Sequence, residues 1–263
     1  MVAVKSPALL ASLSRPLQER IHALSSGTLE GLFVLVWMRA AMRAHENPAL
    51  DVALAAADRL GLPVFVYQGL SSRYPYASDR HHTFILESAR EAHQALKARG
   101  IGSALHVERE GHQGPHLKTL SAQAAVVVTE DLPVPPLRQW TRRLSEACAT
   151  PIWAVDTACI LPMRLSPRAE RAFEFRKATA AQRTRRLDSG WEEQDVSHEP
   201  FLPSLPFAAV DVDLMDIPRL VASCDIDHGV APVPETPGGT TAGRSRWRRF
   251  LEGGGLRGYA RRR

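Results

Sequence analysis

Five short apolar runs alternate, along the first 160 residues, with longer segments whose apolar positions recur every three or four residues. The runs are Leu32–Trp37, Pro63–Tyr67, Ser103–Val107, Ala125–Thr129 and Ile152–Val155. Runs that are apolar at consecutive positions are typical of strands buried on both faces, and helical segments between them are typical of parallel crossovers. Since such crossovers are right-handed, the pattern predicts an α/β fold: a doubly wound five-stranded parallel sheet with helices on both faces.

The segments between these runs carry signals that begin and end helices. Asn47 and Pro48 suit the N-cap and first-turn positions of one helix, which Gly61 ends. Ser78 or Asp79 can begin a second helix, and Gly100 ends it. Two shorter helices are predicted over residues 115–122 and 136–147.

The chain changes character after Pro162. Residues 165–187 predict a basic helix, and the proline- and aspartate-rich stretch that follows predicts an irregular connector. We expect apolar residues to hold the connector to the α/β domain: Trp191, Phe201, Leu202, Leu205 and Phe207. The expected parts are an N-terminal extension (1–30), the α/β domain (31–187), the connector (188–241) and a terminal helical segment (242–263).

Size and composition exclude some classes of protein. The 263 residues, 44% of them hydrophobic, can bury a core. The longest apolar run, Leu32–Trp37, is far shorter than the roughly 20 residues of a membrane-spanning helix. Residues 1–30 lack the apolar stretch of a signal peptide. The three scattered cysteines lack metal-binding spacing, which predicts reduced thiols in a cytoplasmic protein and no metal site.

The formal net charge of +5 comes largely from two arginine clusters. Residues 164–186 contain seven arginines, and residues 244–263 contain eight. Such clusters can neutralise the phosphates of nucleic acid. They are equally typical of solvated helix faces or of a surface that docks onto an acidic partner, and the sequence leaves these alternatives open.

A parallel sheet of this kind binds ligands beyond the carboxyl ends of its strands, where the strand order reverses. The loops that follow the first and fourth strands meet there, and the helix that begins at Asn47 offers free backbone N–H groups. The candidate crevice residues are Met38, Arg39, Asn47, Glu130 and Asp131. The alternative is that Asn47 only caps its helix and that the charged residues are solvated. No dinucleotide, phosphate-loop or nucleophile motif is present, so we predict no catalytic residue.

Taken in order, several segments resemble the photolyase/cryptochrome family, with features closest to class II deoxyribodipyrimidine photolyases. The resemblance covers nearly the whole chain and rests on Val34–Arg39, Arg43–Leu50, Tyr74–Leu86, Val126–Asp131, Ile160–Pro162 and Ala242–Arg263. It identifies residues 31–187 as similar to the N-terminal α/β domain of that family.

The resemblance implies a carbon–carbon lyase that uses FAD and light to repair cyclobutane pyrimidine dimers in UV-damaged DNA, with the damaged bases flipped out of the duplex. In this family the N-terminal domain often holds a folate or deazaflavin antenna chromophore and packs against a helical FAD-binding domain. Tyr259 and Arg263 match positions near the flavin phosphates.

The resemblance also implies a departure from the family. Most of the family's flavin pocket lies beyond the point that matches Arg263, so we expect a chain truncated at the start of the FAD-binding domain. Without that partner domain the chain is not expected to bind FAD tightly or to repair DNA, and its status as an enzyme stays open. The alternatives are a free-standing nucleotide- or chromophore-binding α/β module and a basic DNA-binding accessory protein.

Overall fold

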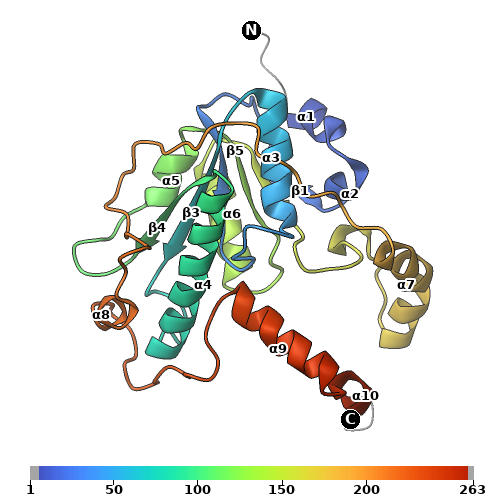
Figure 1. Cartoon of the computed structure of the whole chain (residues 1–263). Coiled ribbons are helices and arrows are strands. Elements are labelled where there is room, and N and C mark those ends of the chain that lie inside the picture. The colour runs from blue at the N-terminus through green and yellow to red at the C-terminus, as the bar shows by residue number, and fades with distance from the viewer. Residues whose placement is uncertain (1–5, 260–263) are drawn as a thin grey trace.

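The computed structural model describes residues 6–259, in which a six-stranded sheet has the order β1-β6-β5-β2-β3-β4 (Figure 1). Neighbouring strands from β6 to β4 are parallel, and β1 runs antiparallel to β6. The strands are β1 (Ile21–Ala23), β2 (Phe33–Trp37), β3 (Val64–Leu70), β4 (Gly102–Val107), β5 (Ala124–Glu130) and β6 (Ile152–Val155).

Helices cover both faces of the sheet, and others lie outside it (Figure 1). They are α1 (Ser6–Ser12), α2 (Arg15–Gln18), α3 (Pro48–Leu60), α4 (Asp79–Ala98), α5 (His116–Ser121), α6 (Leu137–Ala147), a 3-10 turn (Met163–Leu165), α7 (Ala172–Leu187), α8 (Ile217–Ala222), α9 (Thr240–Glu252) and α10 (Gly255–Tyr259). Within residues 6–259, no helix combines the length and the apolar character needed to cross a membrane.

The α/β class and all five predicted parallel strands are confirmed, but the expected strand count was wrong. The sixth strand, β1, lies in the segment predicted as an N-terminal extension, and its Ile21 pairs with Val155. Only Ile21 of its three residues is buried, so its sequence gives no strand pattern. Because Leu13 and Leu17 join the core beside α3, the described part of the segment 1–30 packs as part of the α/β layer.

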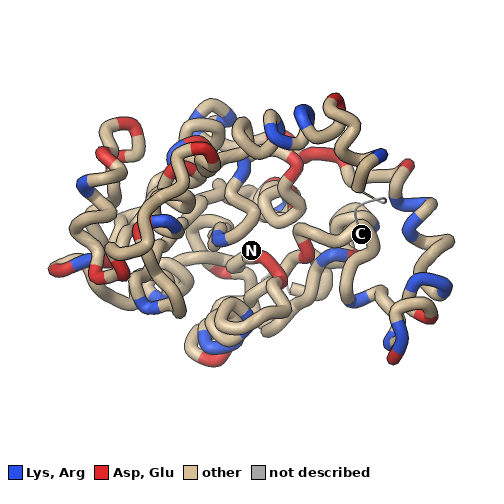
Figure 2. The backbone as a smooth tube through the Cα atoms, turned by 90° about the horizontal axis from the view of Figure 1, so that it is seen from below, with Lys and Arg blue, Asp and Glu red and all other residues tan. Residues whose placement is uncertain are grey.

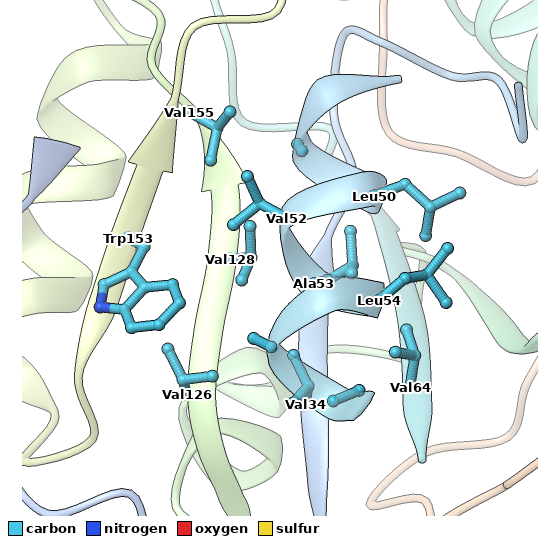
Figure 3. Close-up of a cluster of buried hydrophobic side chains, with 14 of the residues drawn as sticks. Val34, Leu50, Val52, Ala53, Leu54, Val64, Val126, Val128, Trp153 and Val155 are labelled. Carbon is cyan, nitrogen blue, oxygen red and sulfur yellow. The ribbon is translucent and has the colours of Figure 1, made fainter. Parts of the chain in front are cut away.

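Side chains alternate across the sheet and build two cores. Valines of β2, β3 and β5 point toward Leu50, Ala53 and Leu54 of α3 (Figure 3). On the opposite face, Phe33 and Phe65 pack with residues of α5 and α6. This two-sided burial explains why most positions of the strands are apolar, as expected for a parallel sheet.

The connector packs against the domain at several points. The Trp191 indole N–H donates to Oδ2 of Asp51 at 2.7 Å. The Phe201 ring lies 5.5 Å from that of Phe33, and Phe207 lies 5.6 Å from Tyr67. Of the five residues expected to hold the connector, Leu202 is the exception, since its side chain is exposed. The connector thus forms part of the cover over the second face of the sheet.

Helix α9 is attached through its first turn and then extends away from the domain (Figure 1). The Gly238 N–H donates to Oε2 of Glu87 at 2.6 Å, and the Thr241 N–H donates to Oε1 of Glu91 at 2.8 Å. Neither α9 nor α10 buries a residue. Trp247 and Phe250 stack on each other at 5.7 Å on its exposed surface.

Candidate functional site

A crevice of about 1150 Å³ opens at the carboxyl ends of β2 and β3, between α4 and α6. It lies where the chain leaves the central strand β2 in one direction toward β3 and later returns on the other side to form β5. This is the position at which open parallel sheets bind ligands. Its volume lies slightly above the range of roughly 300–1,000 Å³ that is usual for small-molecule sites.

The walls of the crevice are largely apolar and aromatic. Trp37, Tyr74 and Trp140 bring rings from the ends of β2 and β3 and from α6. Polar groups are few and lie among them. The full lining is Trp37, Met38, Arg39, Met42, Gln68, Gly69, Leu70, Ser71, Arg73, Tyr74, Pro75, Tyr76, Ile85, Ala89, Leu105, Pro135, Pro136, Leu137, Gln139, Trp140 and Arg143. Such walls suit a planar ring system held by packing and oriented by a few polar contacts.

Arg39 and Glu130 hold the loops on two sides of the crevice together. Oε1 of Glu130 accepts the backbone N–H groups of Arg39, Ala40 and Ala41 at 2.8, 3.1 and 3.2 Å. The Arg39 guanidinium donates to the Glu130 carbonyl at 2.7 Å and to the Leu137 carbonyl at 3.2 Å. It lies 4.1 Å from the centre of the Trp37 ring, and its side chain is only 6% exposed. Arg39 therefore joins the ends of β2 and β5 to the start of α6.

Burial and charge act in opposite directions on Arg39. Desolvation lowers the pKa of Arg39, and the charge of Glu130 opposes that shift. Since an arginine stays protonated in proteins, the guanidinium is a fixed positive charge beneath the Trp37 ring.

Asn47 acts as a helix cap. Its Oδ1 accepts the N–H groups of Ala49 and Leu50 at 3.1 and 3.3 Å. Its Nδ2 donates to the carbonyls of Ala41 and Arg43 at 2.9 and 3.0 Å. With the side chain 2% exposed and every amide atom paired, the structure favours the alternative in which Asn47 only caps its helix.

Asp131 also lies apart from the crevice lining. Its carboxylate is 3.8 Å from Nδ1 of His22, and burial raises the pKa of Asp131. Of the five candidate crevice residues, Met38 and Arg39 line the crevice, whereas Asn47, Glu130 and Asp131 do not. The polar atoms of Asn47 and Glu130 bind backbone groups of the loops that shape the crevice, and a ligand-binding role for the five residues stays a prediction.

Sequence reasoning missed the wall contributed by β3, α4 and α6. Gln68 lies in β3 beyond the predicted end of that strand at Tyr67. A lone amide next to an apolar run was the signal available for it. Tyr74 and Trp140 gave no such signal. Tyr74 precedes α4 and Trp140 lies in α6, and the two residues come together at the crevice only when these helices pack on the sheet.

Of the two expected flavin-phosphate residues, Tyr259 is the last described residue of α10 and is 55% exposed, and Arg263 lies outside the described residues. No group of three or more histidine, cysteine, aspartate or glutamate side chains within residues 6–259 is arranged to hold a metal ion.

The chain is similar to known proteins over its sheet domain. Residues 34–176 match the DNA photolyase family. A deoxyribodipyrimidine photo-lyase from Methanothermobacter thermautotrophicus is 33% identical over 147 residues, which cover 55% of this chain and 32% of that protein. One from Thermus thermophilus is 31% identical over 144 residues, which cover 53% of this chain and 32% of that protein. The chain thus spans about a third of the length of these curated relatives.

A solved structure gives the same picture of the fold. The crystal structure of an archaeal photolyase from Sulfolobus tokodaii, which holds two FAD molecules, superimposes with a TM-score of 0.55 and 15% sequence identity. The superposition covers 81% of this chain and 45% of that one.

Proposed function

This chain belongs to the DNA photolyase family, and we propose that it supplies the N-terminal α/β domain of a light-driven deoxyribodipyrimidine photolyase. The matched residues 34–176 include β2 apart from Phe33, the strands β3 to β6 and the helices α3 to α6. In this proposal the substrate of the whole protein is UV-damaged DNA, and its catalytic cofactor is FAD.

The role proposed for this domain is to hold an antenna chromophore, a folate or a deazaflavin, in the crevice. The observation that carries it is a crevice at the reversal point of the sheet, lined by Trp37, Tyr74 and Trp140. The Sulfolobus tokodaii photolyase is described with a novel light-harvesting cofactor, which supports an antenna role for a relative of this fold. The Arg39 tether keeps Trp37 and the start of α6 in a fixed relation, so the walls are formed before a ligand arrives.

The first test is binding of 5-deazariboflavin to the purified chain, followed through quenching of tryptophan fluorescence. We expect Trp140→Ala to weaken binding by roughly threefold to tenfold, since an aromatic contact is worth about 0.5–1.5 kcal/mol beyond its buried area. The control is Trp247→Ala, which removes an exposed tryptophan on α9, outside the crevice. Equal losses in the two variants, or no loss in either, contradict the assignment of the crevice.

FAD is expected not to bind tightly at Tyr259 in the 263-residue chain. An isoalloxazine ring needs walls on both faces, and α9 and α10 bury none of their residues. We predict that gel filtration removes added FAD and that the chain alone does not split pyrimidine dimers. Stoichiometric FAD that is retained by the wild type and released by Tyr259→Phe would show this expectation to be wrong.

The arginine clusters support the alternative of a DNA-binding accessory protein less strongly than the crevice supports the antenna role. Figure 2 shows lysines and arginines interspersed with aspartates and glutamates along the backbone. One of the α9 arginines, Arg244, is paired with Glu46 at 2.9 Å. The crevice is the more specific feature, so we favour the antenna role. A cytoplasmic location stays a prediction from the cysteine pattern.

A further inference from the structure

Gln68 is a buried side chain whose hydrogen-bonding groups the fold leaves unused. The residue is 3% exposed, and neither Oε1 nor Nε2 has a hydrogen-bond partner within the described residues. Buried polar groups are nearly always paired, because an unpaired one has lost its water without compensation. The amide therefore points to a ligand that would pair with it.

The position of Gln68 explains why no neighbour pairs with it. Gln68 lies opposite Leu105 in the register of β3 and β4. Alternation along β3 places its side chain on the same face as Val66 and Leu70, the face that α4 covers. The crevice residues on that face include Leu70, Ile85 and Leu105, which offer no polar side-chain atom.

Three other polar side chains of the crevice, those of Arg39, Ser71 and Arg73, already have partners. The Ser71 hydroxyl donates to Oε2 of Glu108, and Arg73 lies 2.7 Å from Oε1 of the same carboxylate. The Arg39 guanidinium is bound to Glu130 and to the Leu137 carbonyl. Gln68 thus brings a free donor and a free acceptor to an otherwise apolar wall, which is the arrangement that orients a ligand in a small-molecule site.

We propose that Gln68 determines ligand specificity by pairing with the edge of a planar heterocycle that presents an N–H donor beside an acceptor. The amide offers its own acceptor and donor side by side, so two parallel hydrogen bonds form. The lactam edge of a flavin, deazaflavin or pterin has this pattern, and an adenine edge pairs with glutamine in the same way. This inference rests on the proposed function, because it assumes that the crevice holds the chromophore.

The test compares Gln68→Leu with Gln113→Leu, the same change at an exposed glutamine outside the crevice. The probes are riboflavin, 3-methylriboflavin, folic acid and adenosine, with dissociation constants from fluorescence or calorimetry. For the ligand that binds, we expect Gln68→Leu to weaken binding by roughly 10-fold to 100-fold, through two lost hydrogen bonds. Gln113→Leu should leave binding within about twofold, since this exposed side chain lies outside the crevice.

The comparison of riboflavin with 3-methylriboflavin tests whether Gln68 pairs with the N3–H edge of the flavin. If riboflavin is the ligand, the N3 methyl group blocks the donor, so 3-methylriboflavin should bind the wild type weakly and show no further loss in Gln68→Leu. If folic acid or adenosine binds instead, the loss in Gln68→Leu supports the same edge recognition from a different source. Equal affinities of the wild type and Gln68→Leu for every bound probe overturn the role of Gln68, while the crevice assignment stands.

If the wild type binds none of the four probes and does not bind 5-deazariboflavin, the proposed function itself is contradicted. This outcome differs from equal affinities of the wild type and Gln68→Leu, which overturn only the role of Gln68. A folding control uses urea unfolding without ligand. Since leucine removes an unpaired amide, the urea midpoint of Gln68→Leu should equal or exceed that of the wild type. A urea midpoint of Gln68→Leu clearly below that of the wild type would mean that the amide stabilises the fold through a partner within the protein, and this outcome overturns the inference.

Discussion

Replacing Glu130 by leucine is expected to lower the free energy of unfolding by about 3–5 kcal/mol, the range for breaking a buried ion pair on one side. The change leaves the Arg39 guanidinium, 6% exposed, without its carboxylate. It also removes the acceptor of three backbone N–H groups, those of Arg39, Ala40 and Ala41. Urea unfolding monitored by circular dichroism measures the decrease in the free energy of unfolding.

The neighbouring carboxylate provides the control. Burial raises the pKa of Asp131, which disfavours its charged form, so Asp131→Asn should cost little. Adding Arg39→Met to Glu130→Leu should recover part of the stability, since no buried charge is then left unpaired. A loss below about 1 kcal/mol for Glu130→Leu would contradict the account of this pair as a structural joint.

Replacing Gly102 by alanine should release part of the connector. A Cβ atom at this position would overlap the backbone carbonyl of Phe201, which cannot move as the end of a flexible side chain can. Phe201 would then lose its contact with Phe33 on the second face of the sheet. The expected cost is about 1–3 kcal/mol, the range for overpacking a well-packed site. Hydrogen exchange should become faster in residues 198–207.

A glycine elsewhere in the connector serves as the matched control. A Cβ atom at Gly190 would meet nothing within 4 Å, so Gly190→Ala should leave stability unchanged or slightly higher. If Gly102→Ala leaves hydrogen exchange in residues 198–207 as slow as in the wild type, the connector is not held there by the close approach to β4.

The parallel strands could be predicted because each is buried on both faces and is therefore mostly apolar. The strand β6 was predicted with the bounds Ile152–Val155 that the structure has. The strand β1 escaped because Ile21 alone faces the core and because its pairing with β6 joins segments 130 residues apart. Such pairing depends on tertiary contacts and leaves no local pattern.

The candidate site was only partly predictable for a related reason. Met38 follows a central strand, so its place at the carboxyl edge is implied by the fold. Asn47 and Glu130 were expected to serve a ligand, but their polar atoms bind backbone groups, and a sequence does not distinguish these uses. The unpaired state of Gln68 emerges only when α4 and β4 have surrounded it.

The hydrogen bonds of Arg39 also have a consequence for which ligands the crevice can select. The Arg39 guanidinium donates to the carbonyls of Glu130 and Leu137, so it links the turn after β2 to the end of β5 and to the start of α6. These hydrogen bonds oppose any change in the spacing of the two crevice walls. Under the proposed function, a crevice whose two walls are held together in this way is expected to favour a flat ring system over a puckered one.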